Sequence, residues 1–170
     1  EKHPAIIVFP QCPKGSYWAT IIDRPEPLKF QYSKSPKNNP ILSLVEGIID
    51  DFIEKYKVDK QRIYIGGLSM GGMGTFEMVY RNPRTFAAAF AICGGANPKI
   101  SKRIRHTSWR IDHGDRDNVV PIIHSELMYK AMKEEKIDVI FKIHKGVNHN
   151  SWDNVFSDSD FIPWLFSKSK

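Results

Sequence analysis

The sequence has few cysteines and no long apolar run. Only two cysteines, Cys12 and Cys93, occur among its 170 residues. Each lies at the end of a predicted strand with different neighbours, which disfavours a disulfide, and neither belongs to a C-x-x-C pair. We therefore expect two buried free thiols. No apolar run approaches 18 residues, so no transmembrane helix is predicted.

Internal repeats, low-complexity tracts and pairs of metal ligands are also missing. No histidine stands at metal-ligand spacing from a second histidine or a carboxylate, so the sequence calls for no metal and no organic cofactor. The net charge of +6 comes from scattered basic residues with one modest cluster, residues 99–105. We interpret that cluster as a solvated face rather than a polyanion site, and we expect no nucleic-acid function.

The rest of the composition fits one globular domain over residues 1–170. Hydrophobic residues make up 41% and charged residues 26% of the chain. Strands and helices alternate, which is typical of a parallel sheet covered by helices. The predicted strands are residues 62–66, 86–93, 107–112 and 139–144, and the predicted helices are 43–56, 72–81 and 121–135.

Three further local predictions concern the helix start, the loops and the end of the chain. Ser43 and Glu46 have the spacing of a capping box at the start of the first helix. Residues 12–40 and 94–106 show no regular pattern, and loops of such length are usually functional or disordered. A short apolar segment, residues 161–166, is expected to cover the sheet.

One motif carries chemistry. Residues 67–71 read Gly-Leu-Ser-Met-Gly between a predicted strand and a predicted helix. This is the context of a nucleophile elbow, a tight turn that exposes a serine hydroxyl beside a base and near backbone N–H donors. A Cβ at Gly67 or Gly71 is expected to clash in so sharp a turn. We predict Ser69 as the nucleophile and the Met70 N–H as one oxyanion donor, against the alternative of a simple Gly/Ser turn.

The downstream sequence offers an acid and a base in the order that this elbow requires. The polar loop at residues 113–121 contains Asp115 and Asp117, and the loop after residue 144 contains His149. Both loops leave the carboxyl ends of predicted parallel strands, where ligands of open α/β sheets are bound. We predict His149 as general base and then general acid, oriented by the aspartate.

These motifs together resemble those of the α/β-hydrolases, most closely the small bacterial esterases related to phospholipase/carboxylesterases and feruloyl esterases. The resemblance implies a three-layer α/β fold with a mostly parallel sheet, and it selects Asp117 over Asp115 as the acid. The strings that carry it are residues 9–13 with Trp18, residues 66–74, residues 91–95, H-G-x-x-D-x-x-V-P at 113–121 and H-N-S-W at 149–152.

The resemblance also implies that something precedes this sequence. The family pattern has about three strands before the one that residues 5–9 resemble, which is the fourth. We therefore expect the chain to be the C-terminal part of the fold, from the fourth strand onward. A missing N-terminal segment of the same protein would supply the strand between residues 5–9 and 62–66, and a loop with the second oxyanion donor. The family resemblance favours a secreted or periplasmic location.

Two tryptophans are candidates for the walls of a substrate pocket. Trp152 follows His149 by three residues, and Trp18 lies in the irregular stretch before residue 40. For Trp18 the alternative is a ring packed on the core. The remaining histidines are expected to be structural or exposed, and they are His3, His106, His113, His124 and His144.

The sequence therefore predicts a serine esterase that works through an acyl-enzyme on a small-molecule or polysaccharide-linked ester. The resemblance suggests acetyl or feruloyl esters of plant polysaccharides, although one fold hosts many functions. Two alternatives stay open. One is a serine peptidase of the prolyl-oligopeptidase type, and the other is an inactive fragment or non-catalytic binding module that lacks the second oxyanion donor.

Overall fold

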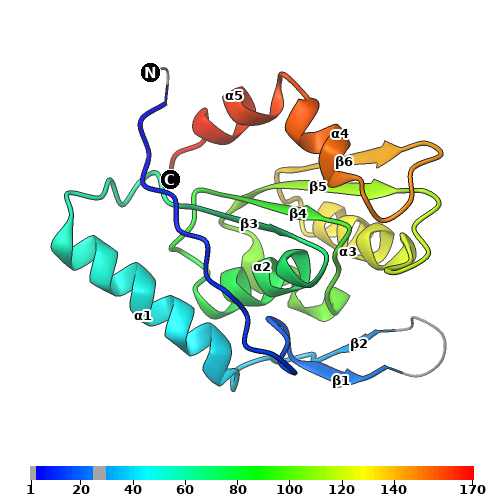
Figure 1. Ribbon diagram of the computed structural model, residues 1–170, viewed down its shortest axis with the longest axis horizontal. Helices are drawn as coiled ribbons and strands as arrows, with labels where there is room; N and C mark the ends of the chain where they lie inside the picture. The colour runs from blue at the N-terminus through cyan, green and yellow to red at the C-terminus, as the bar shows by residue number, and fades with distance from the viewer. Residues whose placement is uncertain (1–2, 25–29) are drawn as a thin grey trace.

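A four-stranded parallel sheet forms the centre of the computed structural model, which describes residues 3–24 and 30–170 (Figure 1). Its order is β3-β4-β5-β6, so neighbours in the sheet are consecutive in the chain. The four strands confirm the predicted ones within a few residues. They are β3 (Tyr64–Leu68), β4 (Ala88–Ile92), β5 (Ser108–Gly114) and β6 (Val139–His144).

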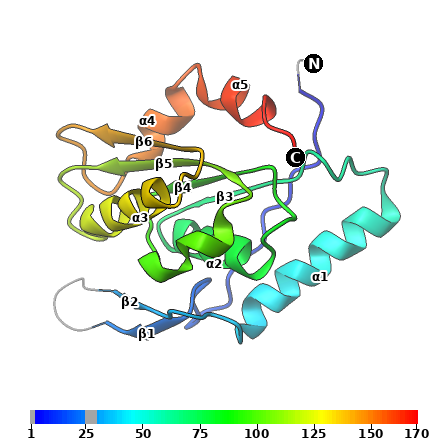
Figure 2. The ribbon, with the colours of Figure 1, turned by 180° about the vertical axis from the view of Figure 1, so that it is seen from behind.

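Helices cover both faces of this sheet, because parallel neighbours must be joined by crossovers. On one face lie α1 (Pro40–Lys55), α2 (Met70–Arg81) and α3 (Ile123–Glu134), with the 3₁₀ helix η1 (Pro98–Ile104) packed between α2 and α3 (Figure 1). On the other face lie α4 (Trp152–Ser157) and α5 (Phe161–Phe166), as the reverse view in Figure 2 also shows. The molecule thus has three layers.

The main core lies between the sheet and α1, α2 and α3. Ala89 and Ala91 of β4 and Trp109 and Ile111 of β5 alternate along their strands and point to this side. Phe76 of α2 stacks on Trp109 with the ring centroids 4.7 Å apart. Both rings are fully buried, and each such side chain stabilises the fold by about 2–3 kcal/mol. This packing fixes α2 against the sheet.

The opposite face of the sheet is apolar along β4 and charged along β5. Phe90 meets Phe161 of α5 edge to face, with the ring centroids 5.0 Å apart. Next to this contact Arg110, which is 2% exposed, donates to Asp112 at 2.8 Å and to Asp158 at 2.7 Å. Lys142 also donates to Asp158, at 2.7 Å. Buried charges persist only when paired, so this network ties the α4–α5 connection to β5 and β6.

Part of the stretch predicted as irregular is ordered into a small hairpin. β1 (Ile21–Asp23) and β2 (Gln31–Tyr32) pair antiparallel and pack on Met73 of α2. The buried carboxylate of Glu77 fastens this arm to α2, since it accepts hydrogen bonds from the N–H and hydroxyl of Thr20 and from the Asn39 amide. The second irregular stretch contains η1, and α4 was not predicted.

The predicted capping box at Ser43 and Glu46 is wrong, because α1 begins three residues earlier. Asn39 caps the helix with its side-chain oxygen, which accepts from the Leu42 N–H at 3.1 Å. Pro40 follows as the first helical residue, where its lack of an N–H costs nothing. Ser43 lies inside the first turn, and Glu46 pairs with Arg81 of α2 instead. The cap and the proline outweigh the capping-box spacing.

The strand predicted at residues 5–9 is also absent. This segment has no strand pairing, and its apolar side chains are open to solvent, with Ile7 71% and Phe9 86% exposed. A strand forms only where a neighbour takes up its hydrogen bonds, and no strand within the described ranges pairs with this segment. Within the described ranges, no helix is long and apolar enough to cross a membrane.

Both cysteines are buried and free, as the sequence predicted. Neither sulfur stabilises the fold through a covalent bond, so packing and charge pairing have to hold the layers together. On the side of α4 and α5, a substitution at Asp158 can test how much the paired charges contribute to stability.

We predict that Asp158→Asn lowers stability at neutral pH. Lys142 and Arg110 hold the pKa of Asp158 far below its usual range, so its stabilising contribution is present above the unfolded-state pKa of about 3.9. That contribution is lost as the pH falls below about 4. Urea unfolding should therefore show a lower midpoint for Asp158→Asn at pH 7 and a shrinking difference toward pH 3. Exposed Asp160→Asn is the control, and equal effects of the two changes would contradict the prediction.

Candidate active site

The turn from β3 into α2 holds Ser69 in an unusual backbone conformation. Its φ of 53° and ψ of −118° lie outside the regions that a serine ordinarily adopts. Such strain is kept only where the surroundings enforce it. Here the Ser69 N–H donates to the Ile92 carbonyl at 2.8 Å, and the Ser69 carbonyl accepts from Met73. The turn therefore fixes the serine at the carboxyl edge of the sheet.

Close packing of backbone against backbone makes this turn possible. A Cβ added to Gly67 would lie 2.4 Å from the carbonyl carbon of Gly71, so the predicted need for glycine at position 67 is confirmed. At Gly71 the prediction is wrong, because a Cβ there would meet nothing within 4 Å. The second close approach is at Gly72, where a Cβ would lie 3.0 Å from the Ile92 carbonyl oxygen. Position 72 thus takes the role expected of 71.

Three side chains predicted from separate motifs meet at this edge. The Ser69 hydroxyl lies 2.8 Å from Nε2 of His149, and Nδ1 of His149 lies 2.7 Å from a carboxylate oxygen of Asp117. An ionised carboxylate only accepts hydrogen bonds, so the neutral imidazole carries its proton on Nδ1. Nε2 is then free to accept the serine proton. The geometry is that of a nucleophile, a base and an orienting acid.

The aspartate that contacts His149 is Asp117, not Asp115. The Asp117 carboxylate is fully buried, and its second oxygen accepts from the N–H groups of Val119 and Val120 at 2.8 and 2.9 Å. Asp115 is exposed and accepts from the Gly146 N–H at 2.6 Å. Each aspartate therefore accepts hydrogen bonds that order its loop, but only Asp117 contacts the imidazole of His149.

A second histidine, His113, also contacts the buried carboxylate of Asp117. Its Nε2 lies 3.2 Å from the Asp117 carboxylate and 2.8 Å from the Val120 carbonyl, and its Nδ1 lies 2.7 Å from the Ser125 hydroxyl. Burial lowers the pKa of His113, although the contacts with Val120 and Asp117 oppose that shift. Sequence reasoning placed His113 among the structural histidines. The only signal of its contact with the acid was its position four residues before Asp117.

Asn148 also joins the loops that carry the acid and the base, and the sequence did not suggest it. Its side-chain oxygen accepts from the N–H of Asn118 at 3.0 Å and from the N–H of His149 at 2.8 Å. One amide thereby fixes the spacing between the Asp117 loop and the His149 loop. Asparagine is common in loops for such backbone contacts, which is why it gave no specific signal.

A buried thiol lies beneath the three side chains. Cys93 is fully buried, has a φ of 42°, and its sulfur is within 4.8 Å of ligand atoms of Asp117 and His149. Such a trio could in principle hold a metal, but metal binding requires a thiolate. Burial raises the pKa of Cys93 to about 12, so the thiol stays protonated. Both nitrogens of His149 are also engaged, and we assign no metal to the trio.

The two predicted pocket tryptophans lie in different places. The Trp152 ring meets the His149 ring edge to face, with the centroids 5.5 Å apart, so it borders the site. Trp18 instead packs beside the main core against α2, where a Cβ on Gly74 would lie 2.4 Å from its own Cβ. No contact among the described residues joins Trp18 to Ser69 or His149. The structure therefore brings only Trp152 to the site.

Met70 is the first residue of α2. An N–H in the first turn has no acceptor within the helix, and the helix dipole favours negative charge at this end. This N–H directly follows Ser69 in the chain, at the end of α2 where negative charge is favoured.

We predict that Gly67→Ala destabilises the protein by about 1–3 kcal/mol, because the new methyl group overlaps backbone that cannot rotate away. Gly71→Ala is the matched control, since its Cβ enters open space. Urea unfolding of both variants measures the difference. If Gly71→Ala proved as damaging as Gly67→Ala, the close approach at position 67 would not be what shapes the turn.

Known proteins share the sequence pattern and the fold of this chain. The profile of the phospholipase/carboxylesterase family matches residues 20–163. The crystal structure of a thermostable esterase superposes with a TM-score of 0.82 at 34% identity, over 94% of this chain and 43% of that one. The shared architecture is the α/β-hydrolase fold, of which the four parallel strands here form the C-terminal part.

Two curated proteins are similar over part of their length. A bifunctional acetylxylan esterase/xylanase of Neocallimastix patriciarum is 38% identical over 92 residues, which are 54% of this chain and 14% of that protein. An acyl-protein thioesterase 1 homolog of Dictyostelium discoideum is 27% identical over 114 residues, which are 64% of this chain and 50% of that protein. The chain thus spans half or less of either relative. On the family match and the fold together, this chain belongs to the phospholipase/carboxylesterase family of α/β-hydrolases.

Proposed function

We propose that this protein hydrolyses carboxylic esters through an acyl-enzyme, with Ser69 as nucleophile, His149 as base and Asp117 as the orienting acid. The observation that carries the proposal is the unbroken chain of contacts from the serine hydroxyl through both imidazole nitrogens to a buried carboxylate, at 2.8 and 2.7 Å. Membership of a carboxylesterase family supports the same reaction class.

The proposed reaction has two proton-balanced halves. Ser69 attacks the ester carbonyl while Nε2 of His149 takes the hydroxyl proton, and the oxyanion is met by the Met70 N–H. The imidazolium then gives that proton to the departing alcohol, which leaves an acyl-serine. Water repeats the sequence with His149 again as base, releasing the carboxylic acid and restoring the serine. Asp117 stays ionised and stabilises the transient imidazolium.

For the substrate, we propose an acetyl or feruloyl ester of a plant polysaccharide. The support is the similarity to an acetylxylan esterase/xylanase, together with an aromatic wall, Trp152, beside the base. An aromatic ring suits a small acyl group or the face of an aryl group.

We further propose that another strand, from polypeptide outside residues 1–170 of the same protein, pairs with the outer edge of β3. The Ile63 carbonyl and the Ser69 N–H bond toward β4, so by alternation the backbone groups of Tyr64, Gly66 and Leu68 point to the other side. No strand pairs with that side within the described ranges. The loop after the added strand would provide the second oxyanion donor.

Hydrogen exchange of the intact natural protein tests the added strand. We expect the amides of Tyr64, Gly66 and Leu68 to exchange as slowly as those of the central strand β4, because a neighbour protects them. Rapid exchange at these three positions, with protection kept at Ile65 and Gly67, would show that the edge is open and the proposal wrong.

Substitutions at the three side chains test the reaction. With p-nitrophenyl acetate, Ser69→Ala and His149→Ala should each abolish nearly all turnover, and Asp117→Asn should reduce kcat by about 10⁴-fold because the imidazole takes the wrong tautomer. Asp115→Asn is the matched control and should do far less. A larger loss for Asp115→Asn than for Asp117→Asn would refute the choice of acid.

Two companion measurements separate the alternatives. A fluorophosphonate should add once, at Ser69, and intact mass should show it. A p-nitroanilide of the same acyl group should be nearly untouched if the protein is an esterase. Comparable anilide turnover would indicate a peptidase instead, and no adduct together with no turnover would indicate a non-catalytic module.

A further inference from the structure

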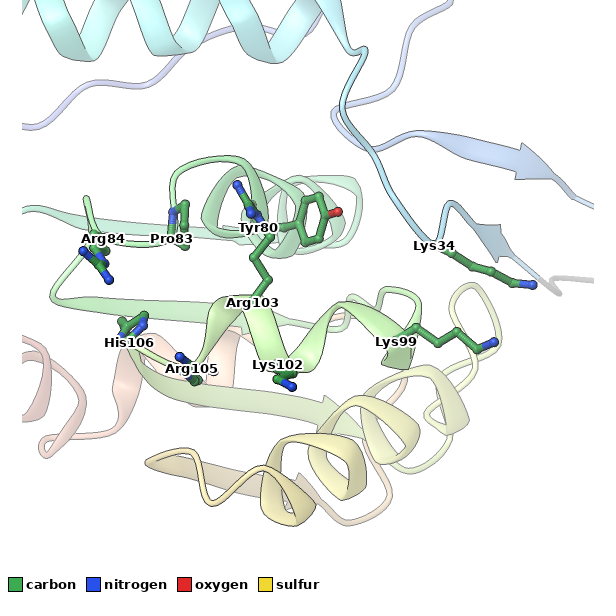
Figure 3. Close-up of a pocket in the computed structure, with 9 residues that line it drawn as sticks. All are labelled: Lys34, Tyr80, Pro83, Arg84, Lys99, Lys102, Arg103, Arg105 and His106. Carbon is green, nitrogen blue, oxygen red and sulfur yellow. The ribbon is translucent and has the colours of Figure 1, made fainter.

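A recess of about 450 Å³ opens between the C-terminal end of α2 and the helix η1 (Figure 3). Three separate parts of the chain meet there, namely the segment after β2, the turn after α2, and η1 with the turn that follows it. Among the residues that the structure describes, no aspartate or glutamate lines it. Six basic side chains do, and they are Lys34, Arg84, Lys99, Lys102, Arg103 and Arg105.

None of the ion pairs found among the described residues involves these six side chains. Arg103 is held in place by its bond to the Tyr80 carbonyl at 2.7 Å, which is an uncharged group. The adjoining recess differs, since its Arg81 is paired with Glu46 at 2.7 Å. Positive charges gathered without counter-charges repel one another, so an anionic ligand would be drawn to them.

The number of basic side chains in the recess equals the net charge of the chain, +6. The sequence holds 25 lysines and arginines against 19 aspartates and glutamates. With the six in the recess set aside, the remaining 19 basic residues equal the acidic ones in number. The sequence alone suggested a solvated face, because only residues 99–105 are clustered along the chain. Folding adds Lys34 and Arg84 to that cluster.

The cations form an elongated row rather than a single point. In Figure 3 Arg84 lies at one end, Lys34 and Lys99 point outward at the other, and Arg103 lies between them. The row starts at the C-terminal end of α2, whereas Ser69 precedes the N-terminal end. At 1.5 Å per residue the two ends of α2 are about 17 Å apart. Ser69, Asp117 and His149 are also not among the residues that line the recess, so it is separate from the triad and cannot be its acyl pocket.

We propose that this cationic recess binds an acidic polysaccharide, with the carboxylates of its uronic acid units accepting hydrogen bonds from the row of arginines and lysines. A row of charges matches a polymer with repeated anionic groups better than a single anion, and guanidinium forks match carboxylates. That the polymer is a polysaccharide rests on the proposed function, in which a polysaccharide ester reaches Ser69.

The aromatic content of the recess favours a polysaccharide over a nucleic acid. Proteins that bind single strands stack bases on free aromatic faces. Within residues 3–24 and 30–170, Tyr80 is the one tyrosine, tryptophan or phenylalanine that lines the recess. The Arg103 guanidinium already lies over its ring, 5.2 Å from the centroid, and its hydroxyl is 3.1 Å from that of Ser35. The recess thus offers charge and hydrogen bonds without a stacking platform.

Affinity electrophoresis of the native protein tests the proposal, with polygalacturonate, neutral arabinoxylan or single-stranded DNA in the gel. We expect retardation by polygalacturonate that falls as salt is added, and none by arabinoxylan. The variant Lys99→Glu/Lys102→Glu should bind polygalacturonate at least about tenfold more weakly. The double variant Lys57→Glu/Lys60→Glu makes the same charge change at exposed positions outside the recess and should bind as the parent does.

Turnover of p-nitrophenyl acetate by the same samples keeps the two proposals apart. Both double variants should match the parent in that assay, since neither changes the triad. Retardation without turnover would leave the recess supported and the proposed reaction refuted. The recess proposal fails if polygalacturonate does not retard the protein, or if both double variants lose binding equally. It also fails if DNA retards the protein more strongly than polygalacturonate, which would indicate a nucleic-acid site.

Discussion

The close contact of β3 with the first turn of α2 is the constraint on which the site depends. Without a side chain at Gly67, the strand and helix approach until Ser69 must adopt a positive φ, and its N–H is held by the Ile92 carbonyl. The same close contact places the first turn of α2 directly after Ser69. Packing of Phe76 on Trp109 then holds α2 in place. The packing that builds the core therefore also fixes the position of the Ser69 hydroxyl.

The position of His149 depends on a different layer of the structure, the one formed by α4 and α5. His149 lies on the loop that leaves β6 and leads into α4, and α4 and α5 are tied to the sheet through Asp158 and Arg110. Arg110 is buried with two carboxylates around it, so the layer cannot shift without exposing an unpaired charge. Serine and base therefore come from opposite faces of the sheet. They meet only because both loops end at its carboxyl edge.

Much of this could be predicted from sequence, because the chemistry lies in short motifs at strand ends. Ser69 and His149 needed only motif order and the direction of the strands, whereas the choice of Asp117 over Asp115 came from the resemblance to a known family. The cap at Asn39 was missed because the capping-box spacing of Ser43 and Glu46 was preferred, although Asn39 followed by Pro40 is also a local signal for a helix start. The strand expected at residues 5–9 depends on a neighbour that local sequence does not encode. The cationic recess was missed for a related reason, since its members are distant in the chain.

Helix α2 has one more consequence. It is a rigid rod, with Ser69 just before its first residue and one end of the cation row, Arg84, just after its last. A polymer held by the cations cannot diffuse away, so its esters near Ser69 would be present at a high effective concentration. That concentration peaks for esters whose distance from the bound carboxylates matches the length of the rod. The helix would then act as a ruler, and selectivity would be set by position along the polymer as well as by the acyl group.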